Sequence, residues 1–475
     1  MTVTSRAAAP QAGPGTTVDW DTLAADVTGR VFLPGSPGFR AGSELFNTRY
    51  ADRAPAAVVS VAGTEDVRRA IRWARDNEVP VVARSGGHSF AGYSVNDGLV
   101  IDMSRMALAS ADGSTGLVTV GGGTRVGHVY DAVRPYEMAI PTGTSPLVGM
   151  AGLALGGGCA YASRRLGLTL DALVQTTVVT ADGAVLTCSA EENPDLFWAC
   201  RGGGGGNFGI NVSFVFQAHP VSDVTTFELT WRWADATAVL VAMQQVLEAA
   251  PDEFSVRMGA STRGSDATTI RDNVTVTTVG QFAGPARELA PLLDPVLSVA
   301  TPLAHEVVER TYWEANAALV HATSADRFAM RTRYATSPIP ADGLAELLSW
   351  VERWPGSGNT DGGGVGMFAW GGRINRVAPD ATAFVHRDTL FLASMDTSWT
   401  AADPPEQVAA NLHWLDGFYE AMGEYLTDSA YQNFPDPALG NWAKAYYGAN
   451  YPRLQEVKRT HDPDNVFHHD QSIQG

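Results

Sequence analysis

Two glycine-rich segments have residue types and spacing that suit the binding of a phosphate group. The first, residues 84–92, places Ser85, Gly86 and Gly87 in succession directly after a short apolar stretch. Successive backbone N–H groups in such a turn converge on an anion, and glycine lets the main chain approach a phosphate closely. The second, residues 143–158, ends with three consecutive glycines. Because each segment lies beside short predicted strands, the two together predict a cradle for a diphosphate.

A third glycine-rich stretch matches the GxGxxG pattern at Gly204, Gly206 and Gly209. A dinucleotide-binding Rossmann unit needs a strand before this pattern and a helix after it. Here a helical pattern at 195–201 comes first and a strand pattern at 210–216 follows, so the order is reversed. No glycine is followed by lysine, which excludes a Walker A phosphate loop.

The histidines show no metal-binding pattern. His305 and Glu306 lack the second histidine of a zinc-protease helix. His461, His468 and His469 lie among turn residues without the spacing of metal ligands. We therefore expect no metal, and a solvated tail around the last three histidines.

Hydrophobic periodicity predicts the elements that position these segments. A helix begins at Thr64 and ends at Asn77, because apolar residues recur at helical spacing between them. Asp182-Gly183 between two β-branched runs predicts a hairpin. The further predictions are strands at 79–83, 99–103 and 117–120, a helix at 125–134, and hairpin strands within 176–188.

The middle of the chain changes character. Alternating strands at 225–233 and 274–279 are interspersed with amphipathic helices at 236–250 and 286–293. This pattern predicts an antiparallel sheet covered by helices on one face. The glycine-rich stretch 354–366 predicts a flexible loop, and a helix returns at 405–422.

Four segments resemble the berberine-bridge-enzyme-like branch of the FAD-linked oxidases, which have the vanillyl-alcohol-oxidase fold. Residues 84–106 (RSGGHSFAGYSVNDGLVIDMSRM) resemble the family's flavin-attachment segment, and residues 153–173 (LALGGGCAYASRRLGLTLDAL) resemble its second flavin loop. Residues 195–210 resemble the segment that closes the FAD domain, and residues 446–473 resemble the C-terminal signature. The four segments stand in the family's order.

The resemblance implies an α+β fold with a PCMH-type FAD-binding domain of two α+β subdomains. A substrate domain of antiparallel sheet covered by helices is inserted into it. We expect the first part of the FAD domain at 29–220, the substrate domain at 221–429, and a C-terminal segment at 430–475 that returns to the FAD domain. The composition of residues 1–28 predicts a flexible leader.

The resemblance also implies FAD as the cofactor, bound covalently through its 8α-methyl group to His88. Members with a second covalent bond carry a cysteine in the pattern G-x-C-P-x-x-G, where this chain has Ser145. Serine is a much weaker nucleophile than a thiolate, so we expect one covalent bond, through His88 alone. Cys159, at a different motif position, is expected to be a small core residue. The residues expected to bind FAD are Arg84, Ser85, Gly86, Gly87, His88, Ser89, Gly92, Thr142, Gly143, Thr144, Ser145, Gly149, Gly152, Gly156, Gly157, Tyr161, Gly209, Ile210, Val212, Tyr447 and Asn450.

The family's catalytic base is missing from its usual place. Many alcohol-oxidising relatives have Y-x-N-Y before the tail, with the last tyrosine as general base, and Phe434 stands there in this chain. Removal of the hydroxyl proton assists hydride transfer from an alcohol, whereas a neutral amine can use its own lone pair. Phe434 therefore favours the oxidation of an amine, or an alcohol oxidation that uses a different base. The candidate bases are Tyr431, Tyr447, Tyr312 and His386.

Two segments resemble the sheet segments that face the flavin in the family. They are residues 370–373 and residues 384–387, and the second is expected to form a strand. Substrate contacts are expected there and around Tyr312-Trp313.

The resemblance implies an oxidase that removes a hydride from a small or medium organic substrate and returns the electrons to O₂, releasing hydrogen peroxide. A hydroxylated natural-product intermediate, a cyclic amine and an oxidative ring closure all remain open as chemistries. A dehydrogenase with another acceptor is an alternative. A flavin-dependent cyclase or isomerase without net redox turnover is a second one.

Composition limits the partners. The chain has 33 basic and 51 acidic residues, net charge −18, so its field repels nucleic acid and anionic membranes. Three cysteines without a CxxC pattern favour a reducing compartment. The N-terminus lacks the apolar stretch of a signal peptide, so we expect a cytoplasmic protein. Its expected state is a monomer or a homodimer.

Overall fold

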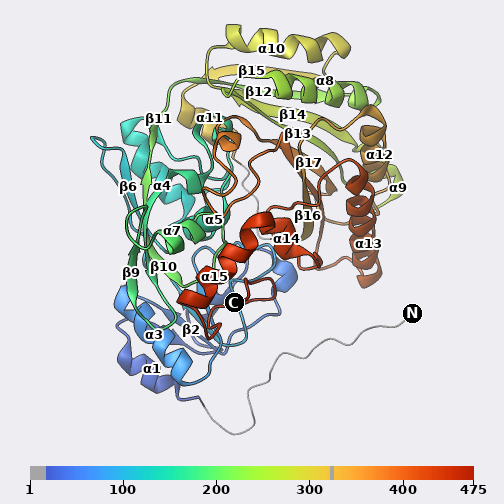
Figure 1. Cartoon of the computed structure of the whole chain (residues 1–475). Helices are drawn as coiled ribbons and strands as arrows, with labels where there is room; N and C mark the ends of the chain where they lie inside the picture. Colours follow the sequence, from blue (N-terminus) through green and yellow to red (C-terminus); the bar gives the residue numbers. More distant parts are fainter. Residues whose placement is uncertain (1–17, 321–325) are drawn as a thin grey trace.

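The computed structural model describes residues 18–320 and 326–475. Within them the strands form four β-sheets. Figure 1 shows two larger bodies: the N-terminal part, drawn blue to green, lies with the red C-terminal segment, and a large sheet with its helices, drawn green-yellow to orange, lies beside them.

A four-stranded sheet ends where the first glycine-rich segment begins. In spatial order its strands are β1 (Arg30–Phe32), β2 (Ala57–Ser60), β4 (Leu99–Asp102) and β3 (Val81–Arg84). The last three are parallel and rich in valine, which fits a buried pleated surface. Helices α1 (Trp20–Asp26) and α3 (Thr64–Asp76) share its core. As predicted, α3 starts at Thr64 and is capped by Asn77.

A five-stranded antiparallel sheet follows, and it contains the predicted hairpin as β8 and β9. Helices α4 (Val126–Val133), α5 (Met150–Gly156) and α7 (Pro194–Ala199) share its core. In spatial order the strands are β5 (Ala109–Ala111), β6 (Leu117–Gly121), β10 (Ile210–Gln217), β8 (Leu173–Val179) and β9 (Val185–Cys188). The shorter elements of this part are α2 (Phe39–Ser43), α6 (Ser163–Leu166), the paired strands β7 (Met138–Ala139) and β11 (His219–Pro220), and the 3-10 helices η1 (Thr48–Tyr50), η2 (Arg134–Tyr136) and η3 (Thr169–Ala172).

The inserted part is a seven-stranded antiparallel sheet with helices on one face, which confirms the predicted architecture (Figure 1). In spatial order the strands are β15 (Ala304–Arg310), β12 (Val224–Trp231), β14 (Thr275–Phe282), β13 (Phe254–Thr262), β17 (Gly363–Ala369), β18 (Phe391–Trp399) and β16 (Arg327–Ala335). The covering helices are α8 (Ala236–Ala249), α10 (Ala286–Val299), α12 (Ala341–Glu352) and α13 (Pro405–Ala421). Shorter helices are α9 (Ala267–Asp272), α11 (Tyr312–Ala318), η4 (Trp233–Asp235), η5 (Gly372–Arg376) and η6 (Met422–Glu424).

Two local predictions for this part were wrong because tertiary packing outweighs the local signal. Helix α10 continues through Pro291 and Pro295 to Val299, since its apolar face is buried in the sheet's core. Strand β17 begins inside the predicted loop. A Cβ added at Gly363 would lie 2.3 Å from the Trp354 Nε1 atom, so this glycine makes room for a buried tryptophan.

Residues 384–387, predicted as a strand, are irregular. The backbone there instead presents Arg387, whose guanidinium donates to both carboxylate oxygens of Asp171 at 2.7 and 2.9 Å. Because Asp171 lies in η3, this paired bond fixes the inserted part against the N-terminal part.

The C-terminal segment packs on the N-terminal part through α14 (Trp442–Tyr447), η7 (Gly448–Asn450) and α15 (Tyr451–His461), as Figure 1 shows in red. A fully buried lysine anchors it. Lys458 Nζ donates to Asp462 Oδ2 at 2.6 Å and to the carbonyl oxygens of Asn207 and Phe467. In the part of the chain that the structure describes, no helix has the length and apolar character needed to cross a membrane. The predicted domain boundaries stay a prediction.

We predict that Lys458→Met lowers the free energy of unfolding by about 3–5 kcal/mol, because Asp462 would remain charged and buried without its partner. Urea unfolding followed by tryptophan fluorescence measures this. The matched control is Lys444→Met, since Lys444 is the other lysine of the chain and is exposed. A Lys458→Met protein as stable as the control would contradict the prediction.

Candidate functional site

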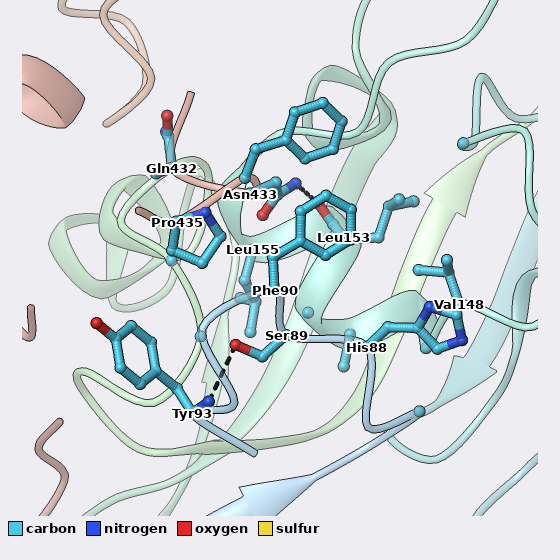
Figure 2. A pocket seen from close by; sticks show the side chains of 18 of the residues that line it. His88, Ser89, Phe90, Tyr93, Val148, Leu153, Leu155, Gln432, Asn433 and Pro435 are labelled. Atoms are coloured by element: carbon cyan, nitrogen blue, oxygen red, sulfur yellow. Dashed lines mark hydrogen bonds between the residues drawn. The ribbon is translucent and has the colours of Figure 1, made fainter. Parts of the chain in front are cut away.

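A cavity of about 500 Å³ lies between the N-terminal part and the seven-stranded sheet. Both predicted glycine-rich segments line it, together with residues 204–211, the C-terminal segment and one face of the sheet. Figure 2 shows side chains from three of these sources: His88 and Phe90, Val148 and Leu153, and Gln432, Asn433 and Pro435.

The two glycine-rich segments touch backbone to backbone beside this cavity. A Cβ added at Gly86 would lie 2.4 Å from the nitrogen of Gly149, and one added at Gly149 would lie 2.4 Å from the nitrogen of Gly86. Gly87 has a φ of 71°, in the left-handed region that favours glycine. The fold therefore needs glycine at these positions to bring the two backbones together at the cavity wall.

His88 projects from the first segment into the cavity, whose wall also includes Val148 (Figure 2). Its ring stacks on Phe46, with the centroids 4.1 Å apart and the planes at 16°. Burial, aided by the positive charges of Arg125 and Arg84, lowers the pKa of His88 from 6.5 to about 4. The imidazole is therefore neutral at physiological pH and keeps a nitrogen lone pair.

Several polar atoms at the cavity wall have no hydrogen-bond partner among the described residues. They are the hydroxyl oxygens of Ser85, Tyr93 and Ser145. Buried polar groups are normally satisfied, so these three point to a polar ligand in the cavity. The close approach of the two glycine-rich backbones, the cavity of about 500 Å³ and the hydroxyl groups without partners fit a dinucleotide with a diphosphate, such as FAD.

Most of the residues expected to bind FAD line this cavity. They are Ser85, Gly86, Gly87, His88, Ser89, Gly143, Thr144, Ser145, Gly149, Gly152, Tyr161, Gly209, Ile210 and Tyr447. Cys159 also lines it and packs with Tyr431, and burial raises the pKa of its thiol to about 12. The thiol is therefore protonated and has little nucleophilic character.

The other expected residues lie behind the wall. Arg84 donates to the carbonyl oxygen of Glu44, and Asn450 donates to the carbonyl oxygen of Pro379. A Cβ at Gly157 would lie 2.6 Å from the Tyr431 hydroxyl, so this glycine packs against that ring. The remaining members of this group are Gly92, Thr142, Gly156 and Val212.

The structure adds cavity residues that the sequence reasoning did not assign. Gly204, Gly206 and Asn207 line the wall, although the order of elements around them excludes a Rossmann unit. Of the three tail histidines that were predicted to be solvated, His468 is exposed, but His469 stacks on Tyr93 at 4.3 Å and burial lowers its pKa to about 3. The sequence signal that could have indicated this burial is the abundance of aromatic and turn-forming residues in the tail.

Tyr431 has the most constrained hydroxyl group of the four candidate bases. It accepts hydrogen bonds from the Gly158 N–H at 2.7 Å and from Asn433 Nδ2 at 3.1 Å. Burial raises the pKa of the Tyr431 hydroxyl group well above 10. Deprotonation near neutral pH is therefore unfavourable, and the contacts give the side chain an anchoring role.

The other three candidates are also held by local contacts. Tyr447 lines the cavity, but its hydroxyl donates to the carbonyl oxygen of Gly203 at 3.0 Å. The His386 ring stacks on Tyr334, outside the cavity wall, and burial lowers its pKa to about 3. Tyr312 lines a separate small hollow. The structure thus brings Tyr431 and Tyr447 to the cavity, and not His386 or Tyr312.

Phe434 belongs to an aromatic cluster with Phe46, Phe90 and Phe328. Phe90 stacks on Phe434 at 5.0 Å and meets the edge of Phe328 at 4.8 Å. Phe328 also contacts Phe46, which stacks on His88. The cluster joins the first glycine-rich segment, strand β16 and the C-terminal segment, and presents an apolar surface beside His88.

Comparisons with known proteins agree with this geometry. Residues 55–189 match the model of an FAD binding domain, and residues 430–474 match that of berberine and berberine-like proteins. The chain is 34% identical to the uncharacterized FAD-linked oxidoreductase YgaK of Bacillus subtilis, over 94% of this chain and 97% of that protein. It is 31% identical to the chitooligosaccharide oxidase of Gibberella zeae, over 92% of this chain and 91% of that enzyme.

A solved structure extends the agreement to the whole fold. The structure of BBE-like 1 from Physcomitrella patens superposes with a TM-score of 0.86 at 28% identity, covering 96% of this chain and 99% of that one. The glycine-lined cavity, the two family models and the near full-length relatives lead to one assignment. The chain belongs to the berberine-bridge-enzyme-like family of FAD-linked oxidoreductases.

Proposed function

We propose that this chain is an oxidase that holds FAD covalently through His88 alone, removes a hydride from a small or medium organic substrate, and uses O₂ as the electron acceptor. The neutral His88 imidazole in the cavity, beside the touching glycine-rich segments, carries the proposal. A neutral imidazole retains the lone pair that a covalent bond to carbon requires.

The names of the relatives support an oxidase. They include a glucooligosaccharide oxidase, a xylooligosaccharide oxidase and a reticuline oxidase, and one relative is named a monolignol oxidoreductase. These names span sugars, a phenylpropanoid alcohol and an alkaloid, so they suggest the reaction class and a set of probes.

Each part of the site has a physical task in this proposal. When bound, FAD supplies the hydride acceptor and passes two electrons to O₂, which gives hydrogen peroxide. The glycine-rich segments offer backbone N–H groups to the diphosphate, and His88 fixes the cofactor. The aromatic cluster excludes water from the space beside His88.

We predict that acid precipitation leaves the yellow colour in the protein pellet for the wild type and in the supernatant for His88→Ala. The physical reason is that acid unfolds the protein and releases any flavin that is not covalently bound. His128→Ala is the matched control, because His128 is exposed on α4 and should leave the colour in the pellet. A coloured His88→Ala pellet would show that another residue also forms a bond.

Ser145→Cys should create a second covalent bond. Ser145 lines the same cavity as His88, and its hydroxyl has no partner among the described residues, so a thiol can take its place. We expect the double variant His88→Ala, Ser145→Cys to keep flavin in the acid pellet. Ser94→Cys, which puts a thiol elsewhere on the cavity wall, is the control that should not. Loss of flavin from the double variant would contradict the placement of Ser145.

Anaerobic mixing should separate an oxidase from the two alternatives. With chitobiose, cellobiose, coniferyl alcohol and reticuline as probes, we expect at least one to bleach the flavin absorbance. Air should then restore the colour and release one hydrogen peroxide for each substrate oxidised. Recovery with a quinone but not with air would indicate a dehydrogenase. Product formed without bleaching would indicate a cyclase or isomerase.

A further inference from the structure

Tyr93 and His469 form a stacked pair in the cavity wall that the proposed function does not use. Tyr93 lies directly after the first glycine-rich segment, and His469 lies near the end of the C-terminal segment. Their ring centroids are 4.3 Å apart and their planes meet at 22°. Both residues line the cavity. The pair is therefore a contact between the first glycine-rich segment and the tail that also faces the space for a ligand.

The Tyr93 hydroxyl group is a hydrogen-bond donor that the described residues leave without a partner. Its oxygen is buried. Burial raises the pKa of this hydroxyl group, so it stays protonated and can donate to a ligand that accepts. The Tyr93 N–H donates to Ser89 Oγ at 3.1 Å, so Tyr93 continues the turn that carries His88. Figure 2 shows the Tyr93 and His88 rings projecting in different directions, so they reach different parts of a ligand.

Hydrogen bonding fixes which nitrogen of His469 carries the proton. The Nδ1 atom of His469 accepts the Gln471 N–H at 3.2 Å. Burial, aided by the charges of Lys458 and His468, lowers the pKa of His469 from 6.5 to about 3, so the ring is neutral. A neutral imidazole that accepts through Nδ1 carries its proton on Nε2. His469 is therefore a donor through Nε2.

The donor edge of His469 lies beside a third glycine-rich turn. A Cβ added at Gly206 would lie 3.9 Å from Cδ2 of His469, the carbon that is bonded to Nε2. Gly204 and Gly206 have φ values of 83° and 76°, and both line the cavity. Backbone N–H groups in such turns converge on anions. This turn, His469 and Tyr93 thus offer donors from three segments to one part of the cavity.

Asn207, the residue after Gly206, fixes the tail on both sides of His469. The Asn207 carbonyl oxygen accepts from Lys458 Nζ at 2.8 Å, and Asn207 Oδ1 accepts the Ile473 N–H at 2.9 Å. Lys458 precedes His469 along the chain and Ile473 follows it. A ligand that binds His469 therefore also stabilises the docking of the tail on the glycine-rich turn.

We propose that Tyr93 and His469 bind the diphosphate of the dinucleotide as two hydrogen-bond donors, one from the first glycine-rich segment and one from the tail. This inference rests on the cofactor of the proposed function. The diphosphate anion has acceptor oxygens, which match a site built of donors. Asp470 lies near the Tyr93 hydroxyl group, but it is exposed, so solvent and salt screen its repulsion of the anion. Binding of the cofactor and docking of the tail then stabilise each other.

The affinities for FAD and for riboflavin, which lacks the diphosphate, test the proposal in the His88→Ala background, where the flavin is not covalently bound. Quenching of flavin fluorescence by the flavin-free protein gives each Kd. Tyr93→Phe keeps the stacked ring and removes only the hydroxyl group. It should raise the Kd of FAD about 10–100-fold, the effect of losing a hydrogen bond to a charged group, and leave the Kd of riboflavin unchanged.

Tyr136→Phe is the matched control, because Tyr136 is exposed and lies outside the cavity wall. It should leave both Kd values unchanged. His469→Gln retains a side-chain N–H donor and should bind FAD more tightly than His469→Leu. Each flavin-free variant should have the thermal midpoint of its parent. Amide hydrogen exchange gives a second readout: FAD should protect residues 462–475 in the parent, and Tyr93→Phe should reduce this protection.

Any result without a selective loss of FAD affinity in Tyr93→Phe overturns the proposal. Equal weakening of FAD and riboflavin is such a result, since a purely structural role of the hydroxyl group would produce it. A wild-type supernatant that holds all the flavin after acid would instead refute the covalent bond of the proposed function. The same titrations then apply to Tyr93→Phe in the otherwise unchanged chain, so the two failures are distinguishable.

Discussion

The hydrogen bond from the Gly158 N–H to the Tyr431 hydroxyl group holds the walls of the cavity together. Gly158 ends the second glycine-rich segment, and Tyr431 begins the C-terminal segment, 273 residues later. The Tyr431 N–H donates to Thr332 Oγ1 of β16, so one residue joins the glycine-rich segment, the tail and the inserted sheet. The hydroxyl group lies on a fully buried ring, and burial raises its pKa, so loss of its proton is unfavourable. The residue that assembles the cavity is therefore poorly suited to act as its base, although its sequence position suggested that role.

Burial then sets the protonation of the groups that face the cavity. Removal of water disfavours a charged form, so it lowers the pKa of a histidine and raises that of an aspartic acid. His88 becomes a neutral imidazole and Asp396 becomes a carboxyl group that exchanges its proton near pH 7. The same low polarity keeps the tyrosines and Cys159 protonated. A single physical cause thus produces a neutral imidazole and a weakly acidic carboxyl group in the wall of one cavity. Arg257 keeps the Asp396 pKa from rising further, and Gly366, in the strand between theirs, is what lets the guanidinium reach across.

The parts of this structure that follow from local chain chemistry were predictable from the sequence. The capped helix after Gly63 and the hairpin around Asp182-Gly183 depend on neighbouring residues, and both form as expected. The two glycine-rich segments line one cavity. Predictions failed where distant contacts decide. Helix α10 continues through two prolines because its apolar face is buried, and residues 384–387 stay irregular because Arg387 pairs with Asp171. The sequence predicted a solvated position for His469, but its ring stacks on Tyr93, which lies directly after the first glycine-rich segment.

Asp396 shows why a buried titratable residue of the cavity is harder to find in a sequence than a glycine-rich loop. In its strand, FLASMDTSW, it is one polar residue in an alternating pattern and has no motif around it. Its environment comes from Met330, Gly366 and Arg257, which lie on three other strands and far away in sequence. Cross-strand neighbours can change without disturbing the glycine-rich segments, because the sheet and the cofactor loops belong to different parts of the fold. A glycine-rich cradle fixed by local backbone geometry can therefore be shared by relatives that are named for sugars, a monolignol and an alkaloid, while the side chains that the inserted sheet presents to the cavity vary independently of it.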